Sequence, residues 1–271
     1  MFVLFGFVTW AMSVQNWKLW PSTSFRLPQP LSGLVQIVIL AFPALGLYLV
    51  FGLPALSATT TAALMPLDTV LGWFYSVVVS ITLTGQTMDN WPWHQIGGGR
   101  PGRVAAASSI GNLVLGTGLY FAMTGLLHVL LGQQTVSELG ASFAQFPAQL
   151  GVCWVFWMIL WATAFGNRPT ALPAAGNLVA RAALTFTLGL GTFALYYSFA
   201  ADQILHEPAV ATGLHGDALG FIDLAVLWTF FYVLGFDSYG LRRPVPGPAN
   251  NLQDPPALVP ITSSPIRKFM K

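Results

Sequence analysis

Seven long runs of apolar residues restrict what this chain can fold into. They cover residues 1–13, 33–53, 67–84, 104–131, 150–165, 175–200 and 218–236. Only 7% of the residues are charged, against about 25% in a soluble domain, so most of the surface cannot face water. In hydrocarbon a helix satisfies its own backbone hydrogen bonds, and the alternating segments of a β-barrel are absent from the sequence. The runs predict an all-α integral membrane protein with seven transmembrane helices in contact with the lipid bilayer.

The charged residues predict an orientation. Seven spans place all eleven Lys and Arg residues in one set of loops. The other set contains four acidic residues, Glu138, Asp202, Glu207 and Asp217. The positive-inside rule makes the basic side cytoplasmic, with the N-terminus outside and the C-terminus inside a bacterial-type plasma (inner) membrane. The transmembrane domain is predicted to cover residues 1–243, and the Pro-rich residues 244–271 to form a disordered cytoplasmic tail.

A turn motif recurs at the end of each odd-numbered run. Its polar residue is Asn16, Asn90, Asn167 or Asp237, and the steps between them are 74, 77 and 70 residues. This spacing predicts tandem helical pairs, with about 3.5 units of roughly 74 residues each. Asn tolerates the positive φ that ends many helices, Pro cannot continue a helix, and Trp prefers the headgroup region. We interpret the motif as a helix stop and interfacial anchor; a polar ring that gates a pathway is the alternative.

Polar residues inside the apolar runs are the candidates for a solute or ion pathway. Asp223 lies 14 residues before Asp237, which is about 21 Å along a helix at 1.5 Å per residue. His128 lies near the outer end of the fourth run, so the two form a candidate proton or cation site. Gln36 and Asn112 lie nearer the cytoplasmic side, where a hydrogen bond to a neighbouring helix is the simpler role.

The last outer loop carries candidate metal ligands, which are Asp202, His206, His215 and Asp217. Asp202 and His206 are four residues apart and share a face if the segment is helical. Carboxylates and imidazoles together bind copper, zinc or iron, and this residue chemistry resembles that of the membrane subunits of copper-dependent monooxygenases. A solvated acidic loop is the favoured interpretation, so no cofactor is predicted.

The first run is shorter than the hydrocarbon core. Its 13 residues cover roughly 20 Å as a helix, about 10 Å less than the core thickness. Three explanations compete: a true start upstream of Met1, a partner membrane subunit that covers the outer part, or a terminal amine in a wet cavity near Asp223.

The composition leaves three classes of function. No catalytic motif is readable, the net charge of +2 is too small to suggest nucleic acid, and the single Cys153 lies in an apolar run where an inert thiol is expected. The first hypothesis is a small-solute permease or the membrane component of a transport system, because parallel repeats are known among transporters. The alternatives are a membrane subunit of a multiprotein oxidoreductase or monooxygenase complex with an outer metal site, and a structural or assembly subunit.

Overall fold

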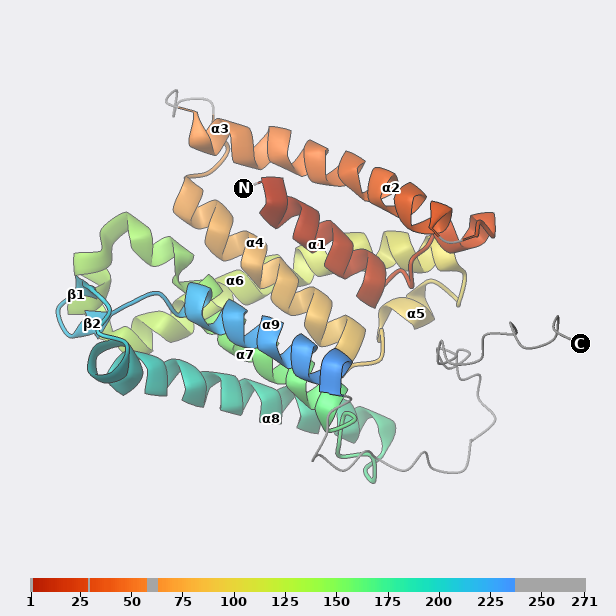
Figure 1. Cartoon of the computed structure of the whole chain (residues 1–271). Coiled ribbons are helices and arrows are strands. Elements are labelled where there is room, and N and C mark those ends of the chain that lie inside the picture. The colour runs from red at the N-terminus through yellow and green to blue at the C-terminus, as the bar shows by residue number, and fades with distance from the viewer. Residues whose placement is uncertain (1, 29, 58–62, 237–271) are drawn as a thin grey trace, which may run out of the picture.

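The computed structural model describes residues 2–28, 30–57 and 63–236, and these are mostly helical (Figure 1). Figure 1 shows the long helices running side by side, with a small hairpin at one end of the bundle. The α-helices are α1 (Phe2–Gln15), α2 (Leu31–Leu47), α3 (Leu53–Leu56), α4 (Leu67–Thr82), α5 (Trp93–Ile96), α6 (Pro101–Leu139), α7 (Phe146–Ala164), α8 (Ala174–Leu195) and α9 (Ala218–Phe236). The antiparallel hairpin consists of β1 (Ala209–Ala211) and β2 (Leu214–His215).

Among the residues that the structure describes, four helical segments are long and apolar enough to cross a membrane, which indicates a membrane protein. They are Leu31–Leu56, Leu67–Thr87, Pro101–Ala164 and Ala174–Ile204. The third contains α6, a 3-10 turn (Gly140–Gln145) and α7, and the backbone of Gly132 leaves the helical conformation within α6. The fourth ends in a π-helix (Tyr196–Ile204).

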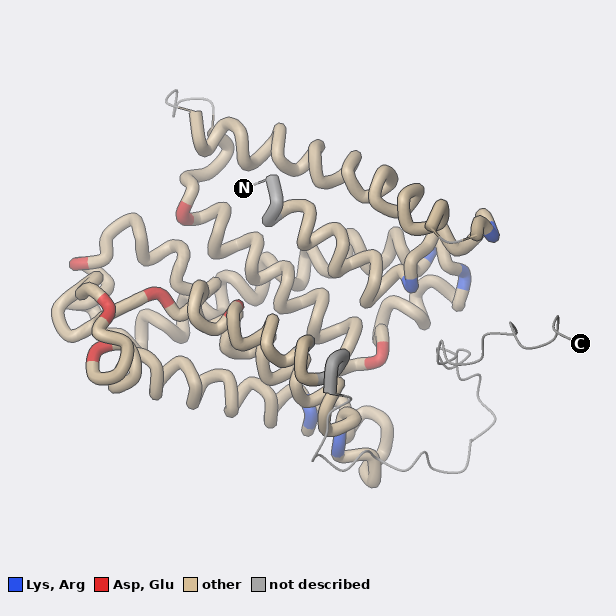
Figure 2. The backbone as a smooth tube through the Cα atoms, in the orientation of Figure 1, with Lys and Arg blue, Asp and Glu red and all other residues tan. Residues whose placement is uncertain are grey.

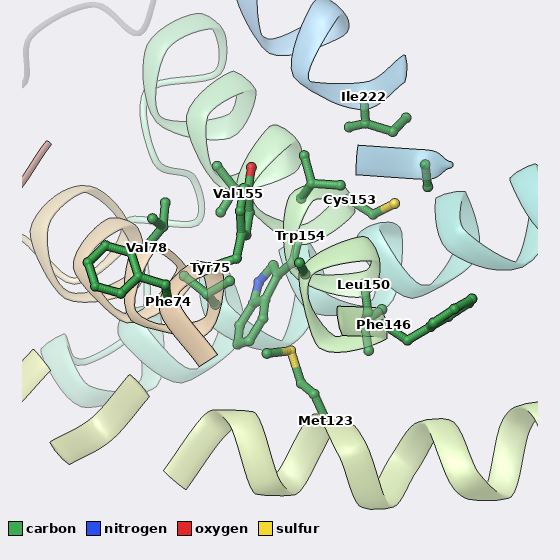
Figure 3. Packing of buried hydrophobic residues seen from close by; sticks show 14 of the residues in the cluster. Phe74, Tyr75, Val78, Met123, Phe146, Leu150, Cys153, Trp154, Val155 and Ile222 are labelled. Atoms are coloured by element: carbon green, nitrogen blue, oxygen red, sulfur yellow. The ribbon is translucent and has the colours of Figure 1, made fainter. Parts of the chain in front are cut away.

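The centre of the bundle is formed by α4 and α7, which pack against each other and against helices on both sides. Buried side chains from both meet there, among them Phe74, Val78, Leu150 and Trp154 (Figure 3). The sulfur of Cys153 is part of the same interior, as the apolar run predicted. Met123 on α6 and Ile222 on α9 close the cluster from the outer helices.

The outer helices expose large apolar side chains. Ile37 and Phe42 on α2 are 67% and 71% exposed, Val179 on α8 is 66% exposed, and Trp228 on α9 is 60% exposed. Exposure of such a surface to water is unfavourable, whereas its contact with the hydrocarbon of a bilayer is favourable. Figure 2 shows Lys and Arg gathered at one end of the helices, and most Asp and Glu at the other.

The turns after α1, α4 and α7 have related backbones. Each contains a cis X-Pro bond, at Trp20–Pro21, Trp91–Pro92 and Arg168–Pro169. Asn90 and Asn167 adopt positive φ, as expected for an asparagine that ends a helix. Asn16 does not, because Lys18 and Leu19 take that conformation in the first turn.

Candidate functional site

Three asparagines from separate parts of the chain meet inside the bundle. Asn16 follows α1, Asn90 follows α4 and Asn112 is on α6; they are 0%, 5% and 0% exposed. Asn16 Nδ2 donates to Asn90 Oδ1 (2.9 Å), and Asn112 Nδ2 donates to Asn16 Oδ1 (3.2 Å). With Thr84 and Ser80 these residues form what we call the asparagine cluster.

The other bonds of the asparagine cluster also link different helices. Thr84 Oγ1 lies 3.0 Å from Asn112 Oδ1 and accepts from Asn16 Nδ2 at 3.3 Å. Asn90 Nδ2 donates to the carbonyl of Asn16 (3.0 Å), and Ser80 Oγ lies 2.9 Å from the carbonyl of Asn112. Because most of its polar groups bond to one another, the cluster fastens α1, α4 and α6 together, and a buried network of this kind rigidifies its surroundings.

This geometry adds an interhelical role to the turn motif. Two of its four residues, Asn16 and Asn90, bond to each other across 74 positions of sequence. The third, Asn167, donates from Nδ2 to the carbonyl of Gln86 (2.7 Å), just before the turn that holds Asn90. Asp237 lies outside the described residues.

A cavity of about 920 Å³ lies beside the asparagine cluster, and we call it the large cavity. Asn16 and Asn90 line it together with Trp17, Lys18, Trp20 and His94, and it extends to Pro101 at the start of α6. Its volume lies in the range of small-molecule sites. The indole N–H of Trp17 is buried without a hydrogen-bond partner among the described residues, so a bound acceptor would satisfy it.

Asp89, which lines the large cavity, forms an ion pair with Arg181. Arg181 Nη1 lies 3.2 Å from Asp89 Oδ2, and Arg181 Nε donates to the carbonyl of Pro169 (3.2 Å). The Arg181 side chain is 8% exposed and that of Asp89 is 73% exposed. The pair ties α8 to the turn after α4 and neutralises the acidic group that borders the cavity.

Asp223 is held by a tyrosine that the sequence analysis did not single out. The hydroxyl of Tyr75 on α4 donates to Asp223 Oδ1 on α9 at 2.8 Å. Tyr75 is 5% exposed, whereas Asp223 lies on the exposed side of its helix. Tyr75 is the ninth residue of α4, so the carboxylate lies well away from both ends of that helix.

A second cavity, of about 430 Å³, lies at the opposite end of α6, and we call it the acidic cavity. Glu138, Gln149 and Asp217 line it. Gln149 is 4% exposed and donates from Nε2 to Asp217 Oδ1 (2.7 Å), while its Oε1 accepts from the N–H of Leu219 (2.6 Å). Sequence analysis missed Gln149, because a glutamine at the start of an apolar run gives no sign of its partners.

The candidate metal ligands do not converge. His215 Nε2 lies 3.9 Å from Asp202 Oδ1, His206 Nδ1 lies 3.0 Å from the carbonyl of Asp202, and Asp217 bonds to Gln149 instead. Within residues 2–28, 30–57 and 63–236 no group of three or more His, Cys, Asp or Glu side chains is placed to hold a metal ion. A metal at this loop stays an untested prediction.

The two other pathway candidates have local partners. Gln36 Nε2 donates to Ser13 Oγ and so joins α2 to α1, while Gln36 Oε1 is buried without a partner among the described residues. The ring of His128 packs edge-on against Phe143, with 4.6 Å between ring centroids. No contact recorded for the described residues joins His128 to Asp223, so the candidate site retains Asp223 with Tyr75.

Comparisons with models of protein families, with curated proteins and with solved structures found no match to this chain. Its function is therefore inferred from its own residues.

Proposed function

We propose that this chain is a small-solute permease, or the membrane component of a transport system, in a bacterial-type plasma membrane. The observation that carries the proposal is the Tyr75–Asp223 pair, a carboxylate bonded to a buried tyrosine in the middle of α4. The large cavity reaches Pro101 and the acidic cavity reaches Glu138, at the two ends of α6. Between them the described core is packed with Phe74, Trp154 and their neighbours. Two cavities at opposite ends of a packed core support alternating access, and an ionisable residue within a membrane helix is a candidate for the pathway.

We further propose that the chain spans the bilayer seven times, with its N-terminus outside. Helices occur at all seven apolar runs, which supports the count. The separation of basic and acidic residues in Figure 2 supports the orientation, with the large cavity cytoplasmic and the acidic cavity outside.

The proposed tandem units are supported by a glycine contact at an equivalent position of their first helices. In the second unit Gly116 of α6 meets the backbone of Val77 on α4, and in the third Gly189 of α8 meets the backbone of Trp154 on α7. Val77 and Trp154 each lie 13 residues before the asparagine of their unit, Asn90 or Asn167. The contact therefore falls at the same position of the first helix in both units, whereas on the second helix Gly116 lies 26 residues after Asn90 and Gly189 lies 22 residues after Asn167.

Replacement of Asp223 tests the transport proposal. Purified protein in liposomes is given concentration jumps of small amino acids, organic acids, amines and sugars, and the transient current is recorded on a solid-supported membrane. We expect one solute class to give a current, and Asp223→Asn to reduce it at least about tenfold, because a hydrogen bond to a charged group contributes roughly 1.5–3 kcal/mol. Tyr75→Phe should reduce it less, since the carboxylate remains.

Asp68→Asn is the matched control, because it removes a carboxylate from the first turn of α4 and leaves the Tyr75–Asp223 pair intact. It should carry the wild-type current. The proposal would be contradicted if no solute class gave a larger current than empty liposomes do, or if Asp223→Asn carried the wild-type current.

The orientation has its own test, since the only cysteine is buried. Arg100 and Gln203 are exposed and lie on opposite sides in the proposed topology. In intact bacterial cells a membrane-impermeant maleimide should label Gln203→Cys, and should label Arg100→Cys only after the cells are permeabilised. The reverse labelling pattern would show that the topology is inverted, and labelling of both variants in intact cells would refute the proposed topology.

A further inference from the structure

Lys18 and His94 give the large cavity a basic wall, at the end of the bundle where Figure 2 shows Lys and Arg gathered. Both side chains are exposed, and neither makes an ion pair or a side-chain hydrogen bond within the residues that the structure describes. Asp89, the acidic residue among the lining residues, is already paired with Arg181. The charge that this wall leaves uncompensated is therefore positive.

The same wall has an N–H donor that the protein leaves unused. Trp17 lines the large cavity, and its Nε1 is buried without a partner among the described residues. The amide groups of Asn16 and Asn90 line the cavity too, but they already bond to each other and to the rest of the asparagine cluster. A buried donor without an acceptor is unfavourable. An acceptor held in the cavity would therefore be stabilised by Trp17, and a negatively charged one would also be attracted by Lys18.

The backbone of the first turn holds Lys18 in a conformation that few residues adopt. The φ angles of Lys18 and Leu19 are 55° and 61°, in the left-handed region that is unfavourable for a residue with a side chain. The turns after α4 and α7 place Asn90 and Asn167 in this region, and asparagine tolerates it. Backbone strain of this kind collects at ligand sites, where the surrounding contacts maintain it. A cation held in this way beside a cavity is a candidate for binding an anion.

The start of α6 forms another side of the large cavity. Pro101 and Val104 line it, so the positive end of the helix dipole lies at the cavity. Arg100 precedes the helix, and its side chain does not cap the first turn. Trp20, which also lines the cavity, packs over the same turn, since a Cβ at Gly102 would lie 3.2 Å from Trp20 Cζ2. The uncapped turn adds a favourable field for an anion to the charge of the basic wall.

We propose that the large cavity binds a phosphate ester, whose oxygens accept hydrogen bonds from the Lys18 ammonium and the Trp17 indole N–H. A phosphate group has several acceptor oxygens and a negative charge, which suits a wall that offers a cation and an N–H from neighbouring residues. The volume of about 920 Å³ leaves room for the organic part of the ester as well. The headgroup of an anionic phospholipid and a free phosphate ester share this chemistry. The inference rests on the large cavity and not on transport.

Two probes test the site and separate the two sources of phosphate. Glycerol phosphate is titrated into the purified protein in a neutral detergent and followed by calorimetry. Phosphatidylglycerol is added to the same preparation and followed by native mass spectrometry. Binding of the first identifies a free ester and binding of the second a lipid headgroup, and either result supports the proposal. We expect Lys18→Gln to weaken this binding by at least about tenfold, because it removes the charge that bonds to the phosphate.

Arg26→Gln is the matched control, because Arg26 is an exposed cation in the same connection and is not among the residues that line the cavity. It should change the affinity by less than about twofold, since salt screens a distant exposed charge. The proposal is overturned if neither probe binds, if Lys18→Gln and Arg26→Gln bind the probe equally well, or if succinate displaces the bound probe at equal concentration.

Trp17→Phe gives a second measurement, because it removes the N–H and keeps an aromatic ring. That N–H has no partner among the described residues, so its loss should leave the unfolding temperature near that of the wild type, while the affinity for the probe falls about fivefold. Trp73→Phe should do the reverse, because the Trp73 N–H donates to Thr117 Oγ1 at 2.9 Å and Trp73 is not among the residues that line the large cavity. Wild-type affinity in Trp17→Phe would overturn the proposal. Probe binding without a transport current refutes only the proposed function, whereas a current without probe binding refutes only this inference.

Discussion

Replacing Asn16 by alanine should destabilise the bundle by about 3 kcal/mol. The Asn16 side chain donates to Asn90 and Thr84 and accepts from Asn112. Its removal therefore leaves two side-chain atoms, Asn90 Oδ1 and Asn112 Nδ2, without these partners. Both groups are buried, and an unsatisfied buried polar group costs about 1–3 kcal/mol. The measurement is thermal unfolding in detergent, followed by the fluorescence of the ten tryptophans.

Asn177→Ala is the matched control, because Asn177 is also buried and makes two hydrogen bonds. Both go to the backbone of Leu172, which is 48% exposed, so water can replace the lost side chain. We expect a loss of about 1 kcal/mol for this variant. Equal unfolding midpoints for Asn16→Ala and Asn177→Ala would show that the asparagine cluster does not fasten the helices.

The positions of the helices could be predicted from the sequence, because an apolar run of membrane length leaves the backbone few alternatives. The end of the fourth run could be predicted as well, because the run ends at Leu131 and the backbone of Gly132 leaves the helical conformation directly after it. The helical segment that follows, up to Leu139, could not be predicted, because its eight residues 132–139 are too few and too mixed in polarity for hydropathy to detect.

The candidate site could be predicted only in its separate residues. Asn16 and Asn90 were recognised as equivalent because they share a turn motif, and Asn112 was identified as a polar residue in an apolar run. Nothing in the sequence shows that the three side chains meet, because the bonds depend on how α1, α4 and α6 pack. Asp223 was identified in the same way, but its partner Tyr75 is 148 residues away, and a tyrosine in an apolar run is not distinctive.

A single added methyl group at Gly116 should destabilise the bundle by a similar amount, about 3 kcal/mol. A Cβ at this position would lie 2.6 Å from Val77 Cα and 3.0 Å from Val77 N. Because the obstacle is backbone rather than a flexible side chain, α4 and α6 must move apart, and overpacking alone costs about 1–3 kcal/mol.

The movement should also weaken the hydrogen bonds on either side of the crossing. Trp73 Nε1 donates to Thr117 Oγ1 at 2.9 Å, and Ser80 Oγ lies 2.9 Å from the carbonyl of Asn112. Both link the same two helices, so a separation of a few tenths of an ångström lengthens each. Gly116→Ala should therefore lower the unfolding midpoint in detergent and lengthen the Trp73 contact, which a change in tryptophan fluorescence would report.

Gly118→Ala separates this packing effect from the effect of losing a glycine. Gly118 lies two residues further along α6, and a Cβ there would meet nothing within 4 Å. Because alanine favours a helix over glycine by up to about 1 kcal/mol, this variant should be as stable as the wild type or slightly more so. Both substitutions replace a glycine of α6 by alanine, but their expected effects on stability have opposite signs. If Gly116→Ala unfolded at or above the temperature of Gly118→Ala, the close crossing of α4 and α6 would be wrong.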